Sequence, residues 1–335
     1  MTEQRQPTRR PTLDQVASRA GVGRGTVSRV VNGSDQVSSR AREAVGRAIE
    51  ELGYVPNRAA RSLVTQRTDT IALVVSESGE RFFSEPFFGR IVQSITASLT
   101  RSDLQLLLMI AQSQADRQRL ETYLTRQHVD GALLLSLHGD DPLPAQLQER
   151  GVAIVRAGRP TNPERTCFVD ADNRGGAFHA VSYLVNQGRR RIATITGPLD
   201  MAVGMARLDG YRDVLGAGPV AIGDFSEESG VAAMQWLLHR YPDLDAVFAA
   251  SDNMAAGAMR VIQESGRRIP QDVAVIGFDD SLIARHTNPT LTSVYQPVEQ
   301  MGAEMVRILL AMLRDQRLDE PAVVLDTHLV KRASA

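Results

Sequence analysis

The residue types best suited to chemistry in this 335-residue sequence lie shortly after apolar runs. Asp279 and Asp280 follow VAVIG and Phe278, Ser251 follows DAVFAA, and Arg207 lies in RLDGY, shortly after RIATITG. In an open parallel sheet, ligands bind beyond the carboxyl ends of the strands. A carboxylate and a guanidinium together can hold vicinal hydroxyls through charge-assisted hydrogen bonds. These residues therefore indicate a ligand site at that edge of a sheet.

The adjacent carboxylates also raise an enzymatic alternative, because glycoside hydrolases need two. Neighbours in sequence, however, rarely face one sugar from opposite sides. No HExxH, GxSxG or Walker motif and no Cys/His metal spacing occurs, and Cys167 is the only cysteine. We therefore expect no catalysis, no cofactor and no metal. For Asp252 and Asp280 we favour a structural role in helix capping and a surface network.

Short apolar runs alternate with helical stretches from residue 69 onward. Runs such as IALVV, LQLLLMI and GALLL are apolar on both faces, and helices such as NMAAGAMRVIQESG separate them. This pattern predicts parallel sheets of βαβ units. The runs are too many for one compact sheet, so we expect an α/β body of two subdomains.

The first 67 residues differ in charge from the rest. They hold twelve Arg against six Asp and Glu, a net charge of +6, whereas the whole chain carries −1. Thr12 and Ser38 are expected N-caps of two helices, and Gly21 ends the first. RGTVSRVVN forms a second helix after the GVG turn. Two short helices joined by a tight turn, with a third as support, predict an all-α helix-turn-helix unit.

A basic helix-turn-helix unit points to double-stranded DNA. A recognition helix fits the major groove, and Arg24 and Arg29 are the long donors at its start. A protein-interaction module is the alternative, which the charge disfavours. The short polar residues suited to phosphates are Thr12, Ser28, Asn32 and Ser38.

The next segment, YVPNRAARSLVTQRT, is a hinge candidate. Pro56 breaks the chain, and Asn57 can cap a short helix that orders only against a partner. Leu63 is suited to act as a wedge in a minor-groove step. A flexible linker is the alternative.

The stretch from TLDQVASRAGVGRG to YVPNRAARSL resembles, without gaps, the DNA-binding head of the lactose/galactose-repressor family. The resemblance implies that Arg24, Gly25 and Arg29 occupy base-reading positions and that Leu63 is the minor-groove lever. Gly25 departs from the usual polar residue and offers no side-chain contact. The positions that the resemblance assigns to phosphates are Thr12, Ser28, Asn32 and Asn57.

The remainder resembles the periplasmic-binding-protein-like body of the same family, in which the chain crosses three times between subdomains and the ligand lies in the cleft. By this resemblance, Arg207 and Asp279 contact the effector, and Ser251 and Phe278 lie beside them. The expected divisions are a head at 1–55, a hinge at 56–68 and a body at 69–335, with a first subdomain at about 69–166 and 297–319 and a second at 167–296 and 320–331.

Four of the nine Phe lie within RFFSEPFFGR, after the first strand of the body. Ser84 as cap and Pro86 at the first helical position predict a helix start. Phe88 then joins a core stripe with Ile91 or Val92, Ile95 and Leu99. Phe87 lies about 100° off that stripe and faces the cleft. The family match makes Phe87 the ligand platform, with Phe88 at its edge. Phe82 and Phe83 are expected in the preceding loop, as cleft rim or as packing.

Segments such as GERFFSEPFFGR, FVDADNRGG and GDFSEESG look like the cellobiose-responsive branch of the family, although the stretch 216–222 is about a dozen residues shorter than usual. The resemblance implies a repressor of carbohydrate-utilisation genes that a sugar releases from a near-palindromic operator. Leucine heptads of the tetrameric members are absent, so we expect a homodimer. With no secretory signal and no membrane span, we expect a cytoplasmic protein.

Two other functions stay open. The first is the same DNA-binding regulator with a maltooligosaccharide, a nucleobase or a sugar phosphate as effector or co-repressor. The second is a sugar-binding or sugar-processing protein whose basic head is incidental.

Overall fold

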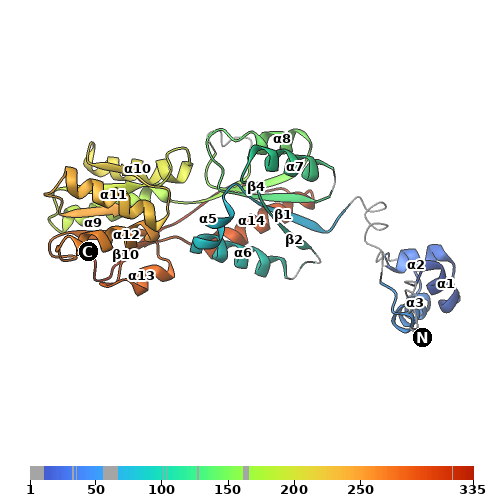
Figure 1. Cartoon of the computed structure of the whole chain (residues 1–335). Coiled ribbons are helices and arrows are strands. Elements are labelled where there is room, and N and C mark those ends of the chain that lie inside the picture. The colour runs from blue at the N-terminus through green and yellow to red at the C-terminus, as the bar shows by residue number, and fades with distance from the viewer. Residues whose placement is uncertain are drawn as a thin grey trace, which may run out of the picture. The chain divides into compact units, whose positions relative to one another are not determined.

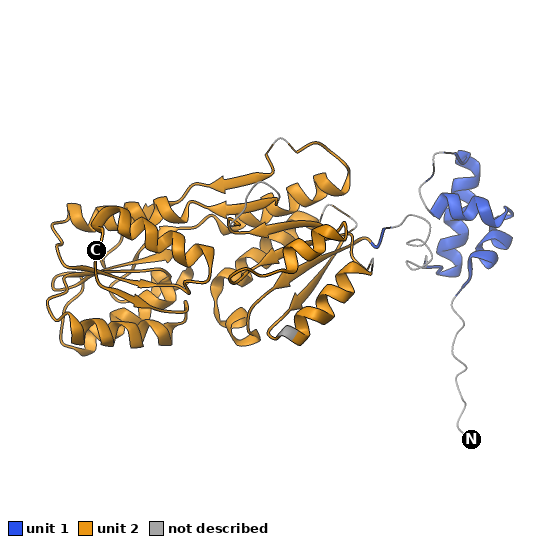
Figure 2. Cartoon of the chain, turned by 90° about the horizontal axis from the view of Figure 1, so that it is seen from above, with its two compact units in different colours: residues 1–68 blue, residues 69–335 orange. Residues whose placement is uncertain are grey.

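The structure is a computed structural model that describes residues 11–31, 34, 36–55, 67–100, 102, 104–126, 128–160, 166–318 and 320–335. The chain divides into two compact units, Met1–Thr68 and Asp69–Ala335, which Figure 2 colours separately and which we call the head and the body. Across the described ranges, no helix is long and apolar enough to cross a membrane.

The described part of the head consists of α1 (Leu13–Ala20), α2 (Arg24–Val31) and α3 (Ser39–Leu52). Thr12 caps α1 in a capping box with Gln15, and Ser38 caps α3. Gly21 and Gly53 end these helices in the left-handed region, with φ of 66° and 60°. The helix-turn-helix fold predicted from the caps is confirmed. Its buried core is formed by Val16, Ala17, Val27, Val45, Ala48 and Tyr54.

The first sheet of the body is parallel and has the strand order β11-β5-β4-β3-β1-β2. Its strands are β1 (Thr70–Val75), β2 (Gln105–Ile110), β3 (Gly131–Leu135), β4 (Ala153–Ala157), β5 (Phe168–Ala171) and β11 (Ala322–Leu325). One face packs against α6 (Pro86–Leu99) and α14 (Val298–Leu313), and the other against α7 (Gln114–Thr125) and α8 (Leu143–Glu149) (Figure 1).

The second sheet has the order β12-β10-β9-β8-β6-β7 and is parallel except for the antiparallel pair of β10 and β12. Its strands are β6 (Ile192–Thr196), β7 (Val220–Ile222), β8 (Ala246–Ala249), β9 (Ala274–Asp279), β10 (Thr292–Tyr295) and β12 (His328–Val330). The helices are α9 (Asn173–Asn186), α10 (Ala202–Leu215), α11 (Glu227–Arg240), α12 (Asp252–Glu264) and α13 (Leu282–His286). The shortened stretch 216–222 leaves only a three-residue edge strand, β7.

The two α/β subdomains are confirmed, but two of their boundaries differ from the expected ones at 167 and 320. β5 pairs with β4, and β11 pairs with β5, so both strands belong to the first sheet. The chain therefore crosses between sheets after β5, after β10 and after β11. Strand pairing decides these boundaries, and pairing is not visible in the local pattern of either segment.

The aromatic segment begins differently from the prediction. Phe82 and Phe83 lie in a short helix, α5 (Gly79–Ser84), rather than in a loop, because Ser78 caps that turn by accepting a hydrogen bond from the Arg81 amide. Phe82 is buried in the core of the first subdomain, whereas the Phe83 side chain is 80% exposed.

The next helix, α6, begins at Pro86 as predicted. Its N-cap is Glu85, without a side-chain capping bond, and not Ser84, which ends α5. Phe88 lies in the core as expected, since its side chain is only 1% exposed. The predicted stripe is also buried, at Ile91, Ile95 and Leu99.

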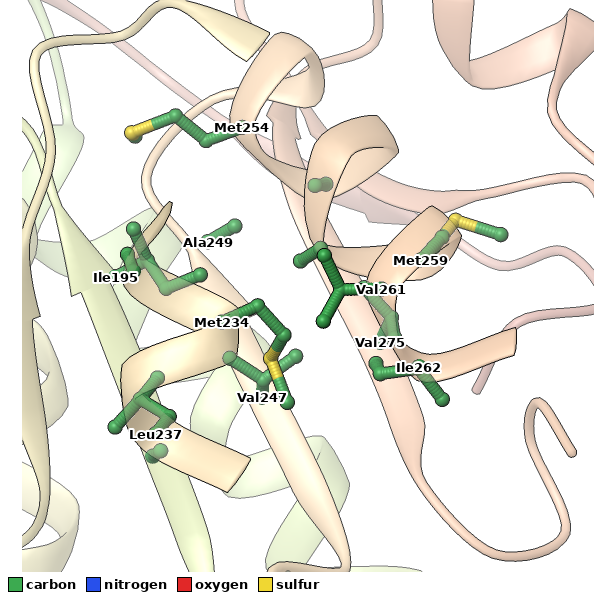
Figure 3. Packing of buried hydrophobic residues seen from close by; sticks show 14 of the residues in the cluster. Ile195, Met234, Leu237, Val247, Ala249, Met254, Met259, Val261, Ile262 and Val275 are labelled. Atoms are coloured by element: carbon green, nitrogen blue, oxygen red, sulfur yellow. The ribbon is translucent and has the colours of Figure 1, made fainter. Parts of the chain in front are cut away.

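Helices α11 and α12 cover one face of the second sheet, and Met234, Leu237 and Ile262 from these helices belong to one buried cluster with Val247 and Val275 of the strands (Figure 3). The two helices approach closely because each has a glycine at the crossing. A Cβ on Gly230 would lie 2.3 Å from the carbonyl oxygen of Met254.

We expect Gly230→Ala to lower the free energy of unfolding of the body by about 1–3 kcal/mol, because the added methyl must push two helix backbones apart. The control is Gly89→Ala in α6, where no heavy atom lies within 4 Å of the added Cβ. That change should raise the free energy of unfolding by about 0.5–1 kcal/mol. Urea unfolding of both variants measures the difference, and equal effects would contradict the close crossing.

Candidate functional site

The predicted base-reading residues share the exposed side of α2. Arg24 and Arg29 are exposed, and the Arg24 guanidinium lies 3.7 Å from the Asp14 carboxylate. Gly25 lies between them, with no heavy atom within 4 Å of its missing Cβ. The Gly25 position therefore leaves open space on this side of α2.

Two of the predicted phosphate-binding residues, Thr12 and Ser38, are exposed N-caps, so the free amides of α1 and α3 lie beside their hydroxyls. Ser28 is half-buried on α2. Three further predicted DNA contacts, Asn32, Asn57 and Leu63, lie outside the described residues.

A cleft in the body lies between the carboxyl ends of the two sheets. The first subdomain contributes residues that follow β1, β3, β4 and β5, and the second contributes residues that follow β6, β7 and β9. The charged and aromatic side chains that line it are Arg81, Glu85, Phe87, Phe88, Arg156, Asp170, Arg207, Phe225 and Asp279. Of the six effector residues predicted, the structure brings Phe87, Phe88, Arg207 and Asp279 together here.

Arg207 is the most deeply buried cation of the cleft, with 3% of its surface exposed. Its guanidinium stacks on the Phe278 ring at 3.6 Å from the ring centroid. Burial lowers the pKa of Arg207, and Asp279 opposes that shift. Its hydrogen bonds go to Asn173 Oδ1 at 2.9 Å, Ala250 O at 2.5 Å, Asp279 Oδ1 at 3.3 Å and Gln296 Oε1 at 3.3 Å.

Asp279 ends β9 in a backbone conformation that L-residues rarely adopt, with φ at 107°, and Asp280 follows with φ at 45°. Such strain is concentrated at functional sites. Burial raises the pKa of Asp279, and Arg207 holds it down. The Asp279 carbonyl oxygen also accepts a hydrogen bond from Arg90 of the first subdomain, at 3.4 Å.

Aromatic rings line the cleft from both subdomains. Phe87 and Phe88 come from α6, and their rings meet edge to face with centroids 5.4 Å apart. Phe225 comes from the segment after β7 and lies under the Arg81 guanidinium, 5.2 Å from the ring centroid. Apolar ring faces beside hydrogen-bonding groups suit a ligand that has both C–H faces and hydroxyls.

Arg81 and Glu85 form an ion pair at the rim, 3.1 Å apart, and Arg81 also pairs with Glu77 at 2.9 Å. Burial raises the pKa of Glu85 to about 7, against the opposing effect of Arg81. A carboxyl with that pKa can donate or accept a hydrogen bond near neutral pH.

The remaining predicted residues have structural positions behind the cleft. Ser251 is buried as the N-cap of α12, and Phe278 is a fully buried ring beneath Arg207. Asp252 accepts hydrogen bonds from the Ser281 amide and the Ser293 hydroxyl, and Asp280 pairs with Arg332. Both carboxylates thus have structural roles, as expected, but in buried hydrogen-bond networks rather than in helix capping or at the surface, because Asp252 is 1% exposed and the Asp280 side chain 7%.

His138 joins the two subdomains beside the cleft. Its Nδ1 lies 2.9 Å from Asp200 Oδ2 in the second subdomain, and its Nε2 lies 3.1 Å from Glu77 Oε1 in the first. The Gly139 amide also donates to the Asp200 carbonyl oxygen. Two carboxylate partners require both ring nitrogens to donate, which only the imidazolium can do. The bond to Glu77 accordingly raises the pKa of His138, and Asp200 adds to the rise.

Several residues of the cleft were not predicted from the sequence. Arg81 and Glu85 lie within RFFSEPFFGR, where only the aromatic residues and the helix start were weighed, and Gln296 follows a strand outside any motif that was weighed. Phe225 lies in GDFSEESG, and Arg156 is a charge within the apolar strand VAIVRAG. A charge inside a buried strand and an aromatic residue just past a strand end are the signals that could have identified these two.

Two family descriptions match the chain: bacterial regulatory proteins, lacI family, over residues 12–57, and periplasmic binding protein-like domain over residues 181–335. The HTH-type transcriptional regulator CelR of Thermobifida fusca is 55% identical, covering 97% of this chain and 98% of that protein. The transcriptional repressor PurR of Klebsiella pneumoniae is 33% identical, over 96% of both.

The solved structures that this chain resembles are also transcription regulators. A transcriptional regulator CelR–cellobiose complex is 53% identical with a TM-score of 0.77, over 97% of this chain and all of that one. A Lac repressor dimer bound to operator is 29% identical with a TM-score of 0.85, over 97% and 99% of the two chains. These relatives are regulators and not enzymes, as expected for this chain. On identity that extends from the head through the body, the chain belongs to the lacI family of DNA-binding transcription regulators.

Proposed function

We propose that this protein represses carbohydrate-utilisation genes and leaves a near-palindromic operator when cellobiose or a related oligosaccharide enters the cleft of the body. The observation that carries the proposal is the composition of the cleft. Rings from both subdomains flank Arg207 and Asp279, the donor and acceptor pair that suits vicinal hydroxyls. The relative solved with cellobiose supports the choice of sugar. Such a repressor acts on the chromosome, in the cytoplasm.

A titration of the protein on its promoter DNA tests this proposal. Cellobiose should release the DNA, whereas a maltooligosaccharide and a nucleobase should not. Tighter DNA binding with a nucleobase would favour a co-repressor function. No response to any saccharide would contradict the proposal.

Phe87→Ala should weaken the response to cellobiose by tenfold or more, because it removes a ring face from the cleft, while operator affinity without sugar stays unchanged. The control is Phe83→Ala, which changes an 80% exposed ring outside the cleft. Fluorescence anisotropy of labelled operator at rising sugar concentration gives both quantities. If Phe83→Ala impaired the response as much as Phe87→Ala, the platform role of Phe87 would be wrong.

A homodimer is part of the proposal, because a two-fold pair of heads matches a near-palindromic operator. The first sheet offers a suitable surface at its edge strand β2, whose sequence QLLLMI is apolar yet only partly covered. Leu108 in the middle of this strand is 39% exposed. Native proteins seldom leave such an edge uncovered.

Leu108→Arg should shift the protein from dimer to monomer and weaken operator binding, because a guanidinium would be buried without a partner. Ile222→Arg on β7, the edge strand of the second sheet, is the control. Analytical ultracentrifugation reports the mass of each variant. A Leu108→Arg protein that stays dimeric would place the interface elsewhere.

Effector binding is proposed to close the two subdomains and to separate the paired hinge segments at 56–68, so that Leu63 leaves the minor groove. Coupling between such sites is typically about 1–3 kcal/mol. His138 contributes to closure in this mechanism, because its imidazolium binds Glu77 and Asp200 across the two subdomains.

Because the pKa of His138 lies above its ordinary 6.5, its stabilisation of the body is complete below pH 6.5 and is lost as the pH rises through the raised value. The wild-type melting temperature should therefore exceed that of His138→Gln most at acidic pH, and the difference should shrink above pH 6.5. His128→Gln, which changes a ring stacked on Tyr123, is the control. A difference that is independent of pH would rule out the imidazolium bridge.

A further inference from the structure

Arg156 is a charged residue within an otherwise apolar, largely buried strand, β4, and its side chain lines the cleft. Its Nε is buried and has no hydrogen-bond partner among the described residues. Among these described residues, the Arg156 guanidinium also has no ion-pair partner and no aromatic ring in contact. A buried donor without an acceptor is unfavourable, so Arg156 at this position lowers the stability of the ligand-free protein.

The other two guanidinium groups of the cleft are satisfied by the protein itself. Arg207 donates to four acceptors, and Arg81 pairs with Glu77 and Glu85. Among the described arginines of the cleft, Arg156 is therefore the one whose donors are available to a ligand.

Two carboxylates, Asp141 and Asp170, stabilise the charged form of Arg156, although neither forms an ion pair with it. Burial lowers the pKa of Arg156, while Asp141 and Asp170 oppose the shift. Asp141 is itself engaged, by the Leu143 amide and by Arg117 at 3.4 Å. Asp170 lines the cleft from the adjacent strand β5, and burial raises its pKa.

We propose that Arg156 is a specificity-determining residue for the effector, and that its free N–H groups donate to acceptor oxygens of a neutral saccharide beside Asp170. This inference rests on the proposed function. Three arginines and three carboxylates line the cleft, so an anionic ligand would lie beside Glu85, Asp170 and Asp279. A site that holds buried donors for an oxygen discriminates strongly against ligands that lack it.

The test compares Arg156→Met with Arg156→Lys and with Arg150→Met, a surface control on the same subdomain that removes an exposed pair with Glu121. Calorimetry on the full-length protein measures the Kd for cellobiose and for cellobionate, its anionic aldonic acid. Thermal unfolding without sugar provides a second measurement.

Arg156→Met should weaken cellobiose binding by tenfold or more, while the melting temperature without sugar is unchanged or higher, because an unpaired buried cation has been removed. Arg156→Lys should recover part of the affinity, and Arg150→Met should bind as the wild type does. The wild type should prefer cellobiose to cellobionate.

Cellobiose binding by Arg156→Met within twofold of the wild type would overturn the inference and leave the proposed function intact. A melting temperature that falls together with the affinity would also overturn it, since that result indicates a structural role. A wild-type preference for cellobionate would contradict the neutral ligand. A wild type that binds no saccharide would overturn the proposed function as well.

Discussion

The cleft depends on one buried cation. A guanidinium that is 97% removed from solvent is tolerated only where it is paired and hydrogen-bonded. Arg207 meets that condition with acceptors from α9, from the end of β8, from β9 and from the segment after β10, and with the face of Phe278. These segments are far apart in sequence, so the second sheet must be in register before the charge is satisfied. The hydrogen bonds that position Arg207 in the ligand site are thus also contacts that stabilise the second subdomain.

Asp279 connects Arg207 to the other subdomain. Its carboxylate pairs with Arg207, and its carbonyl oxygen accepts from Arg90, which in turn pairs with Glu299 on α14. A ligand that binds the carboxylate therefore acts on groups of both subdomains. The strained backbone at Asp279 and Asp280 holds the carboxylates apart: one faces the cleft, and the other is bound to Arg332. This explains why adjacent aspartates do not form a catalytic pair here.

Much of the fold could be predicted because its signals are local. Thr12, Ser38 and Gly21 define helix ends through hydrogen bonds to residues a few positions away, and the apolar runs identify the buried strands. The assignment of β5 and β11 was wrong because strand pairing joins segments over 150 residues apart. Among the candidate cleft residues, Ser251 and Phe278 were expected beside the ligand because they follow strands, yet the direction of each side chain depends on what packs behind it.

The sequence by itself determined the domain order, the helix-turn-helix head, the parallel α/β body and the family, since caps, periodicity and motif spacing are properties of short segments. Only the tertiary structure decided which charges in the cleft are already paired. The sequence does not show which of Arg81, Arg156 and Arg207 has a partner, whereas burial and the position of distant acceptors make two of them part of the scaffold and leave the third with unused donors. Hydrogen-bond satisfaction depends on groups brought together from across the chain, so no local pattern can reveal it.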